Sequence, residues 1–159
     1  MLSENDDLDF GRALVHKFFE YVQAGDPDAI LGLTSAEATI TLVPLGIRGL
    51  MANEGVAYFA SLASAFPDLV VRIRRVFTAT DGTAVAEVTI DGTQAGEFLG
   101  VVNQEKHFDL DQAWLLKIGP DQQIVAVTGY WDQNQLYRRL GVKRLDRITI
   151  TALEQSATV

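Results

Sequence analysis

Asp132 is the residue of this sequence whose surroundings best suit acid–base chemistry, because Tyr130 and Trp131 stand directly before it. A carboxylate acts as an acid or a base near neutral pH when burial against apolar surface raises its pKa. Alternate residues of a strand point to the same side, so Thr128, Tyr130 and Asp132 should share one face. We therefore expect a catalytic Asp132 on the concave face of a sheet, with Tyr130 and Thr128 contacting the substrate.

The same aspartate also suits a structural role. The run Asp132-Gln133-Asn134-Gln135 has the form of a capping box, with Asp at the N-cap and Gln three residues later. Backbone N–H bonds and the positive end of the helix dipole both lower the pKa of a capping carboxylate. One carboxylate oxygen can cap a helix while the other faces a pocket, so both roles stay open.

Gln94 and three aromatic residues complete the set of candidate site residues. Gln94 ends a strand-like segment, where its amide could position a substrate carbonyl as part of the catalytic machinery. Trp114, Phe18 and Phe59 are either core residues or the lining of a substrate-binding pocket. The sequence leaves both interpretations of these rings open.

Composition excludes several other chemistries. The chain has no cysteine and two histidines, His16 and His107, which we expect to be exposed, so a Cys/His metal site cannot be assembled. No nucleophile elbow, dinucleotide fingerprint or P-loop is present. The net charge of −8 leaves no basic footprint for nucleic acid, and the basic residues between Arg138 and Arg147 should be a solvated helix end. We expect no metal, no cofactor and no nucleic-acid partner.

The overall composition is typical of one soluble domain. Of 159 residues, 48% are hydrophobic and 21% are charged. No apolar run approaches the roughly 20 residues that span a bilayer, and the acidic N-terminus lacks the features of a signal peptide. We expect a cytoplasmic protein with no membrane partner. Its organisation should be a flexible segment 1–9, a domain 10–142, and a tail 143–159 in which residues 147–153 could form a short strand.

Four helices are predicted from periodicity and from capping residues. Apolar residues at helical spacing predict a helix over about residues 10–24, ended by Gly25. Asp26 followed by Pro27 is typical of a helix start, and this second helix should run to about Leu33. The last helix is predicted over 132–140, ended by Gly141. The third is predicted over about residues 53–65, with an apolar face of Val56, Phe59, Ala60 and Ala63.

Five strands are predicted, at about residues 38–43, 69–80, 83–94, 106–118 and 123–131. The alternation slips at Arg74 and Arg75, which indicates a β-bulge, and Asp81-Gly82 favours a hairpin turn. Because the order contains no β-α-β units, a parallel sheet is not expected. We predict an α+β fold in which a curved antiparallel sheet packs on three to four helices and leaves a cleft.

Three segments resemble the SnoaL-like polyketide cyclases of the NTF2-like superfamily. They are AFPDL at 65–69, IDGTQAGEFLGV at 90–101 and YWDQNQLYRRLGV at 130–142, and the resemblance extends over about residues 10–142. It implies a cone in which the curved sheet wraps around the helices and encloses a pocket. It also implies ring closure by aldol chemistry without a metal or a cofactor, with Asp132 at the position of the acid–base aspartate.

The sequence departs from the family pattern at two positions. Gln94 replaces the histidine of the G-T-H-x-G stretch, and a glutamine can bind a carbonyl but cannot carry a proton near pH 7. Trp114 stands where the family often has a further histidine. The related ketosteroid isomerases use a tyrosine where this chain has Phe18 and an aspartate in the strand that here reads Ile40–Val43, so steroid isomerisation is not expected.

Two functions remain. The first is a cofactor-free cyclase, isomerase or dehydratase that acts through Asp132 and Gln94 on a hydrophobic, polyketide-like or terpenoid small molecule. The alternative is a non-catalytic domain that binds such a molecule. The resemblance also implies a homodimer, and the strands carry apolar residues on both faces, as at 84–86 and 125–127.

Overall fold

The computed structural model describes residues 4–143, with side chains from Phe10 onward. The helices are α1 (Glu4–Ala24), α2 (Pro27–Leu31), α3 (Val56–Ala65) and α4 (Gln133–Arg139). The strands are β1 (Thr34–Leu42), β2 (Ile47–Leu50), β3 (Val70–Thr78), β4 (Thr83–Thr93), β5 (His107–Ile118) and β6 (Ile124–Trp131). A 3-10 turn (Val43–Leu45) precedes β2, and a π-helical turn (Met51–Gly55) leads from β2 into α3.

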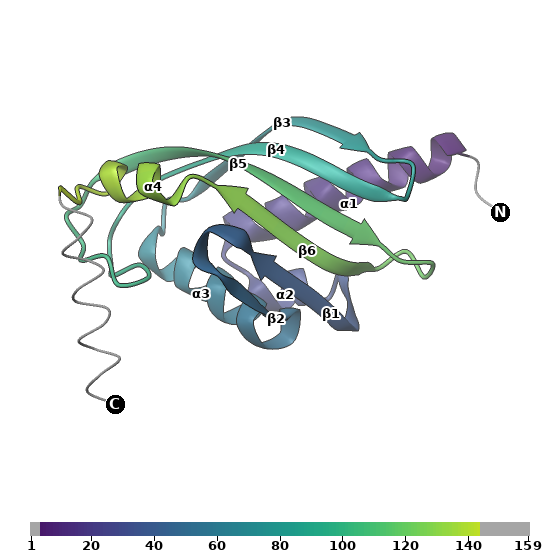
Figure 1. The fold of residues 1–159 in the computed structure, drawn as a ribbon, viewed down its shortest axis with the longest axis horizontal. Coiled ribbons are helices and arrows are strands. Elements are labelled where there is room, and N and C mark those ends of the chain that lie inside the picture. Colours follow the sequence, from purple (N-terminus) through teal and green to yellow (C-terminus); the bar gives the residue numbers. More distant parts are fainter. Residues whose placement is uncertain (1–3, 144–159) are drawn as a thin grey trace.

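The six strands form one curved sheet in the order β2-β1-β6-β5-β4-β3 (Figure 1). Neighbouring strands are antiparallel except β1 and β6, which run parallel. The α+β class is confirmed, but the expectation of a wholly antiparallel sheet is wrong at this pair. Four strands and α3 separate β1 from β6 in the chain, so β6 returns beside β1 in the same direction without forming a β-α-β unit.

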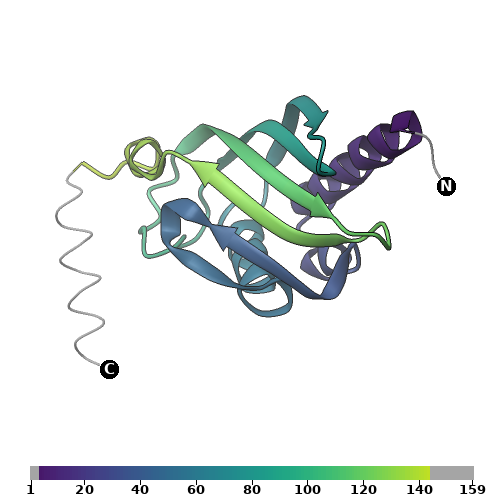
Figure 2. The same cartoon turned by 45° about the vertical axis from the view of Figure 1, so that its right-hand side comes forward.

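Helices α1, α2 and α3 lie on one side of the sheet in both views (Figures 1 and 2). Helix α1 packs against β3 and β4, whereas α4 lies at the end of β6 and contacts β5. The space between helices and sheet is filled by a continuous apolar core. No helix within residues 4–143 combines the length and apolar character needed to cross a membrane.

The predicted turn and capping residues are confirmed. The Asp26 side chain accepts a hydrogen bond from the N–H of Ala29 at 3.1 Å and so caps α2. Gly82 has a φ of +87° in the β3–β4 turn, a conformation that favours glycine. The register of β3 against β4 shifts between Ile73 and Arg75, which is the predicted bulge.

Several element boundaries differ from the prediction. Helix α1 begins at Glu4, earlier than the predicted start at about residue 10. Strand β2 lies in a segment without a strand prediction, because four residues are too few to show a period. Strand β1 begins at Thr34, four residues earlier than expected. The strand predicted at 147–153 lies outside the described residues.

Candidate functional site

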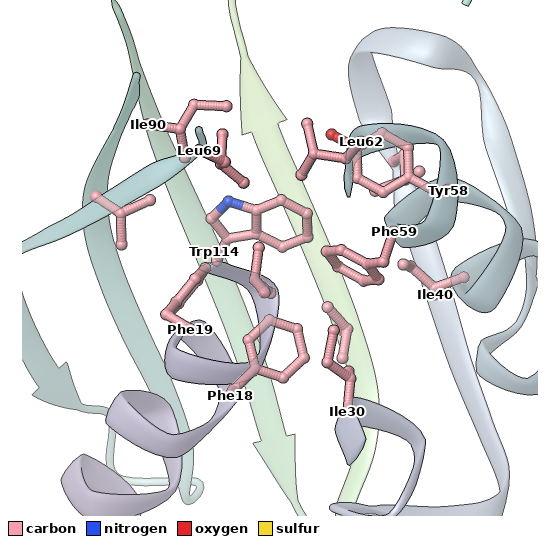
Figure 3. Close-up of a cluster of buried hydrophobic side chains, with 14 of the residues drawn as sticks. Phe18, Phe19, Ile30, Ile40, Tyr58, Phe59, Leu62, Leu69, Ile90 and Trp114 are labelled. Atoms are coloured by element: carbon pink, nitrogen blue, oxygen red, sulfur yellow. The ribbon is translucent and has the colours of Figure 1, made fainter. Parts of the chain in front are cut away.

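Aromatic side chains fill the inner side of the sheet (Figure 3). Phe18 from α1, Phe59 from α3 and Trp114 from β5 are each at most 4% exposed. The ring centroid of Phe59 lies 5.7 Å from that of Phe18 and 6.0 Å from that of Trp114. The structure therefore brings these three predicted residues together, but as packed core. Their rings contact one another, and neither of the two hollows along α1 is lined by these three residues.

Trp114 is held in place on two sides. Its Nε1 donates a hydrogen bond to Oε1 of Gln112 at 2.9 Å, and both side chains point inward because they lie two residues apart on β5. Gly129 of β6 is its cross-strand partner, and a Cβ at Gly129 would lie 2.7 Å from Cη2 and Cζ3 of the indole. A glycine inside a strand is the sequence signal for such a close approach.

Tyr58 and Trp131 form a stacked pair at the end of β6. Their ring centroids are 5.9 Å apart with an interplanar angle of 20°, and Trp131 also lies 5.9 Å from Trp114. Trp131 is half-buried and its Nε1 donates to Oε1 of Gln133 at 2.7 Å. Tyr58 is 5% exposed, and burial raises the pKa of its phenol, which therefore stays a neutral hydrogen-bond donor.

The apolar face predicted for the third helix missed Tyr58. The buried residues of α3 are Tyr58, Phe59, Leu62 and Ala65, not the predicted set around Ala60 and Ala63. Tyr58, Leu62 and Ala65 follow the i, i+4, i+7 spacing, so the periodicity contained the correct face. Treating a tyrosine as an apolar residue would have revealed it.

The turn between α3 and β3 anchors the strand end that carries Gln94. Oδ1 of Asp68 accepts a hydrogen bond from the N–H of Thr93 at 2.8 Å, and this bond is the main reason that the pKa of Asp68 is lowered. A Cβ at Gly92 would lie 3.2 Å from Oδ1 of Asp68 and 3.3 Å from Cβ of Phe66. The glycine therefore allows β4 to lie directly against this turn.

Gln94 points into the protein and holds the loop that follows it. It is 1% exposed, and its Nε2 donates to the carbonyl oxygens of Gly96 and Val101, both at 3.0 Å. Its own Oε1 is buried and has no hydrogen-bond partner in the described part of the chain. The structure thus places this predicted residue in the interior, with one unused acceptor.

Asp132 caps α4. Its Oδ1 accepts a hydrogen bond from the N–H of Gln135 at 3.0 Å, which confirms the capping interpretation. The residue is exposed and directly follows Trp131 at the end of the sheet. Because Oδ1 forms the cap, Oδ2 is the oxygen left for a substrate. Its catalytic role stays a prediction.

Thr128 and Tyr130 lie on the outer face of the sheet. Thr128 is the cross-strand partner of Leu115, and Tyr130 that of Ala113, whereas Trp114 pairs with Gly129 and points inward. Tyr130 is 43% exposed. The expectation that both residues face the concave side is therefore wrong, because the inward phase of β6 falls on residues 127, 129 and 131.

The buried side chains of the described residues include no carboxylate and no imidazole; the polar ones are two threonines and the amides of Gln94 and Gln112. His16 and His107 are exposed, as predicted. No group of three His, Asp or Glu side chains within the described residues could hold a metal ion. Two open hollows lie along α1, and neither Asp132 nor Gln94 lines them.

Comparison with known proteins decides the family. A sequence model of the SnoaL-like polyketide cyclases matches residues 13–140. The chain belongs to this family. No curated protein sequence matches it.

Solved structures share the fold. A protein assigned as a SnoaL-like polyketide cyclase from Jannaschia sp. CCS1 has a TM-score of 0.78 at 17% identity, covering 91% of this chain and 100% of its own. AclR from Streptomyces galilaeus, assigned as a hydroxylase, has a TM-score of 0.74 at 20% identity, with 84% and 97% covered. A protein from Catenulispora acidiphila described as having a ketosteroid isomerase-like fold has a TM-score of 0.68 at 17% identity, with 81% and 92% covered. The fold is thus the NTF2-like one shared with ketosteroid isomerases.

Proposed function

We propose that this SnoaL-like domain binds a flat, apolar small molecule of the polyketide-like or terpenoid kind at the end of β6. The observation that carries the proposal is the Tyr58–Trp131 stack, in which a half-exposed indole lies over a buried ring. A planar ligand can replace one ring of such a stack and keep the aromatic contact. The Gln133 amide borders the stack through its hydrogen bond from the Trp131 indole, whereas buried carboxylates and imidazoles do not occur among the described residues. These features favour binding over acid–base catalysis in the interior.

Two neighbouring aromatic residues allow a matched test. Trp131 takes part in the stack and Tyr130 lies on the opposite face of the sheet. Binding of 2-acetylnaphthalene, measured by isothermal titration calorimetry, should weaken about fivefold in Trp131→Leu, since a lost aromatic contact costs about 1 kcal/mol. Tyr130→Leu should bind as the wild type does. Equal affinities in the two variants, or no binding by the wild type, would contradict the proposal.

A second candidate function is catalysis by Asp132, favoured by family membership and by its place beside the stack. The reaction would begin when a carbon next to a carbonyl transfers a proton to Oδ2 and leaves an enolate. Gln94 would then bind the carbonyl only if its amide turned over, because its Nε2 is engaged by two backbone carbonyls. Asp132 is therefore the residue on which this candidate depends.

Enolisation can be measured without knowing the substrate. In D₂O, deuterium should replace the C1 protons of 2-tetralone faster with the protein than without it, as followed by NMR. Asp132→Asn should reduce this acceleration by about 10²-fold while keeping the cap, because Asn caps helices as well as Asp does. Asp26→Asn, at the similarly capped start of α2, is the matched control. Equal acceleration in the two variants would exclude Asp132 as the base.

We also propose that the chain forms a homodimer through the outer face of the sheet. Phe77, Val85, Leu115 and Thr128 are cross-strand neighbours in one row on this face, and Phe77 is 41% exposed. A row of three apolar side chains and one threonine across four strands favours burial against a second copy. Light scattering should give twice the chain mass at micromolar concentration, and Leu115→Lys should lower it. A monomeric wild type would rule the dimer out.

A further inference from the structure

We propose that the C-terminal segment 144–159 binds the loop between β4 and β5 of its own chain and covers two exposed apolar side chains there, Leu99 and Val102. This interaction is independent of the ligand and of the reaction proposed above. Residues 144–159 lie outside the described part of the chain, whereas the surface that would receive them lies within it.

The tip of this loop is a two-residue hairpin with apolar side chains on both sides. The backbones of Phe98 and Val101 form two hydrogen bonds with each other, of 3.1 and 2.8 Å. Their side chains are 2% and 3% exposed, so one side of the hairpin packs into the core. Leu99 and Val102 are 36% and 74% exposed. The hairpin therefore leaves two large apolar side chains at the surface.

Leu99 also has an unfavourable backbone conformation. Its φ is +49° and that of Gly100 is +83°, the combination found in a type I′ turn. Asparagine, aspartate and glycine suit the first of these positions, whereas a leucine there loses conformational free energy. Its exposed side chain gains nothing from solvent in return. Contact with another apolar segment would offset both disadvantages.

The described chain ends beside this loop. Nε2 of Gln104 donates to the carbonyl oxygens of Leu140 and Gly141 at 3.4 and 3.1 Å, so the loop is bound to the C-terminal end of α4. The loop and α4 lie at the same end of the sheet (Figures 1 and 2). Val142 packs against the core. The segment 144–159 therefore starts next to the loop, and its 16 residues could span roughly 50 Å when extended, far more than the contact requires.

The segment carries the apolar residues that such a contact needs. They alternate with polar residues and are Leu145, Ile148, Ile150 and Leu153. If residues 147–153 are extended, as the sequence predicts, Ile148 and Ile150 point to the same side. These two side chains can then contact Leu99 and Val102 together.

The charges of the two segments are complementary. Residues 95–105 contain Glu97 and Glu105 and no lysine or arginine. Residues 143–147 contain three basic residues and one aspartate. Opposite charges favour this pairing and disfavour an acidic partner on the loop. A bound segment would also strengthen the connection that Gln104 makes between the loop and α4.

A nitroxide label detects the contact in the full chain, which has no cysteine of its own to react with the label. The label is attached to Lys106→Cys, an exposed position at the end of the loop. The NMR amide signals of residues 148–153 should then lose most of their intensity. The same label at Asp121→Cys should leave them unchanged, because the 12 residues of β5 separate the two positions by roughly 40 Å.

Two substitutions in the loop test which side chains receive the segment. Leu99→Asn removes the apolar side chain and strengthens the turn, because asparagine followed by glycine is a preferred type I′ pair. With the label at Lys106→Cys, both Leu99→Asn and Val102→Asn should restore the signals of residues 148–153. Val70→Asn is the matched control, because this valine is 39% exposed on β3, and it should keep the signal loss.

Several results would overturn the proposal. They are full signal intensity with the label at Lys106→Cys, an equal loss with the label at Asp121→Cys, and a loss that persists in both loop variants. A mixture of nitroxide-labelled chains and isotope-labelled chains without nitroxide tests a second copy as the partner. Unchanged signals in this mixture are expected. Signal loss there would mean that the segment binds the loop of another chain, which would overturn binding within one chain.

Discussion

Replacing Gly129 with alanine should destabilise the protein, because the new methyl group would meet the indole of Trp114. The Cβ would lie 2.7 Å from Cη2 and Cζ3 and 3.1 Å from Cε3. These separations are well below the 3.5–4.0 Å at which two carbon atoms are in favourable contact. The indole cannot simply move away, because Phe18, Phe19, Phe59 and Trp131 surround it and Gln112 binds its N–H.

Two opposing contributions decide whether Gly129→Ala raises or lowers the free energy of unfolding. In a strand that alanine can adopt, the change from glycine would by itself stabilise the folded state by about 0.5–1 kcal/mol, because it restricts the unfolded chain. Overpacking a filled core costs about 1–3 kcal/mol. We expect a net loss of about 1–2 kcal/mol from the free energy of unfolding for Gly129→Ala. The urea midpoint should then fall by roughly 0.5–1 M.

Urea unfolding followed by tryptophan fluorescence measures this loss. Gly96→Ala is the control, because the nearest atom to its Cβ would be the Ser64 carbonyl oxygen at 3.8 Å, an ordinary contact. Combining Gly129→Ala with Trp114→Leu should recover part of the loss, and the coupling energy should exceed about 0.5 kcal/mol. A Gly129→Ala variant as stable as the wild type would refute the reasoning. It would mean that Trp114 can move aside and that the interior could open to a ligand.

Three further predictions concern ionisation and capping. Asp132→Ala should lower the free energy of unfolding by about 1 kcal/mol and the Tm by about 2–4 °C, because Leu136 and Leu140 couple α4 to the core. Asp26→Ala should lower the Tm by a similar amount. An unchanged Tm for Asp132→Ala in a thermal melt would contradict the capping role. The N–H of Thr93 lowers the pKa of Asp68, so the resulting stability is present above the ordinary pKa of about 4 and is lost as the pH falls through the folded-state pKa. In Asp68→Asn, the urea midpoint should therefore depend less on pH between pH 5 and 2.5 than it does in the wild type. An equal pH dependence in the two proteins would be evidence against this contribution. Burial raises the pKa of Tyr58, so its neutral form favours folding below the ordinary pKa of about 10, and this contribution is lost as the pH rises above that value. Tyr58→Phe should therefore unfold at a higher alkaline pH than the wild type, as followed by circular dichroism. Equal alkaline unfolding midpoints in the two proteins would disprove this.

The local features of the fold were within reach of the sequence, because they depend on neighbours in the chain. The cap by Asp26, the bulge near Arg75 and the turn at Gly82 each follow from a few adjacent residues. The parallel pairing of β1 with β6 does not, because it joins strands separated by four others. A pattern within one strand has no information on which strand lies beside it, so the sheet order required the structure.

In the candidate site, too, features set by adjacent residues could be predicted and features set by strand pairing could not. Capping by Asp132 could be predicted from the four residues that follow each other at the start of α4. The faces of Thr128 and Tyr130 could not, because a strand read by alternation alone has two equivalent phases. Gly129 was the available signal, since a glycine opposite a tryptophan marks the face on which the ring lies. Using it would have turned Trp131 inward and Tyr130 outward.

The two departures from the family pattern have one physical consequence. At the two positions where the sequence resemblance implies histidines, this chain has the Gln94 amide and the Trp114 ring. An amide fixes the direction of a hydrogen bond without titrating near neutral pH, and an indole fills space while donating one hydrogen bond. Both replacements remove a side chain that can transfer a proton and leave one that forms hydrogen bonds of fixed direction. Neither replacement titrates near neutral pH, and among the predicted site residues only Asp132, at the exposed end of the sheet, carries a carboxylate.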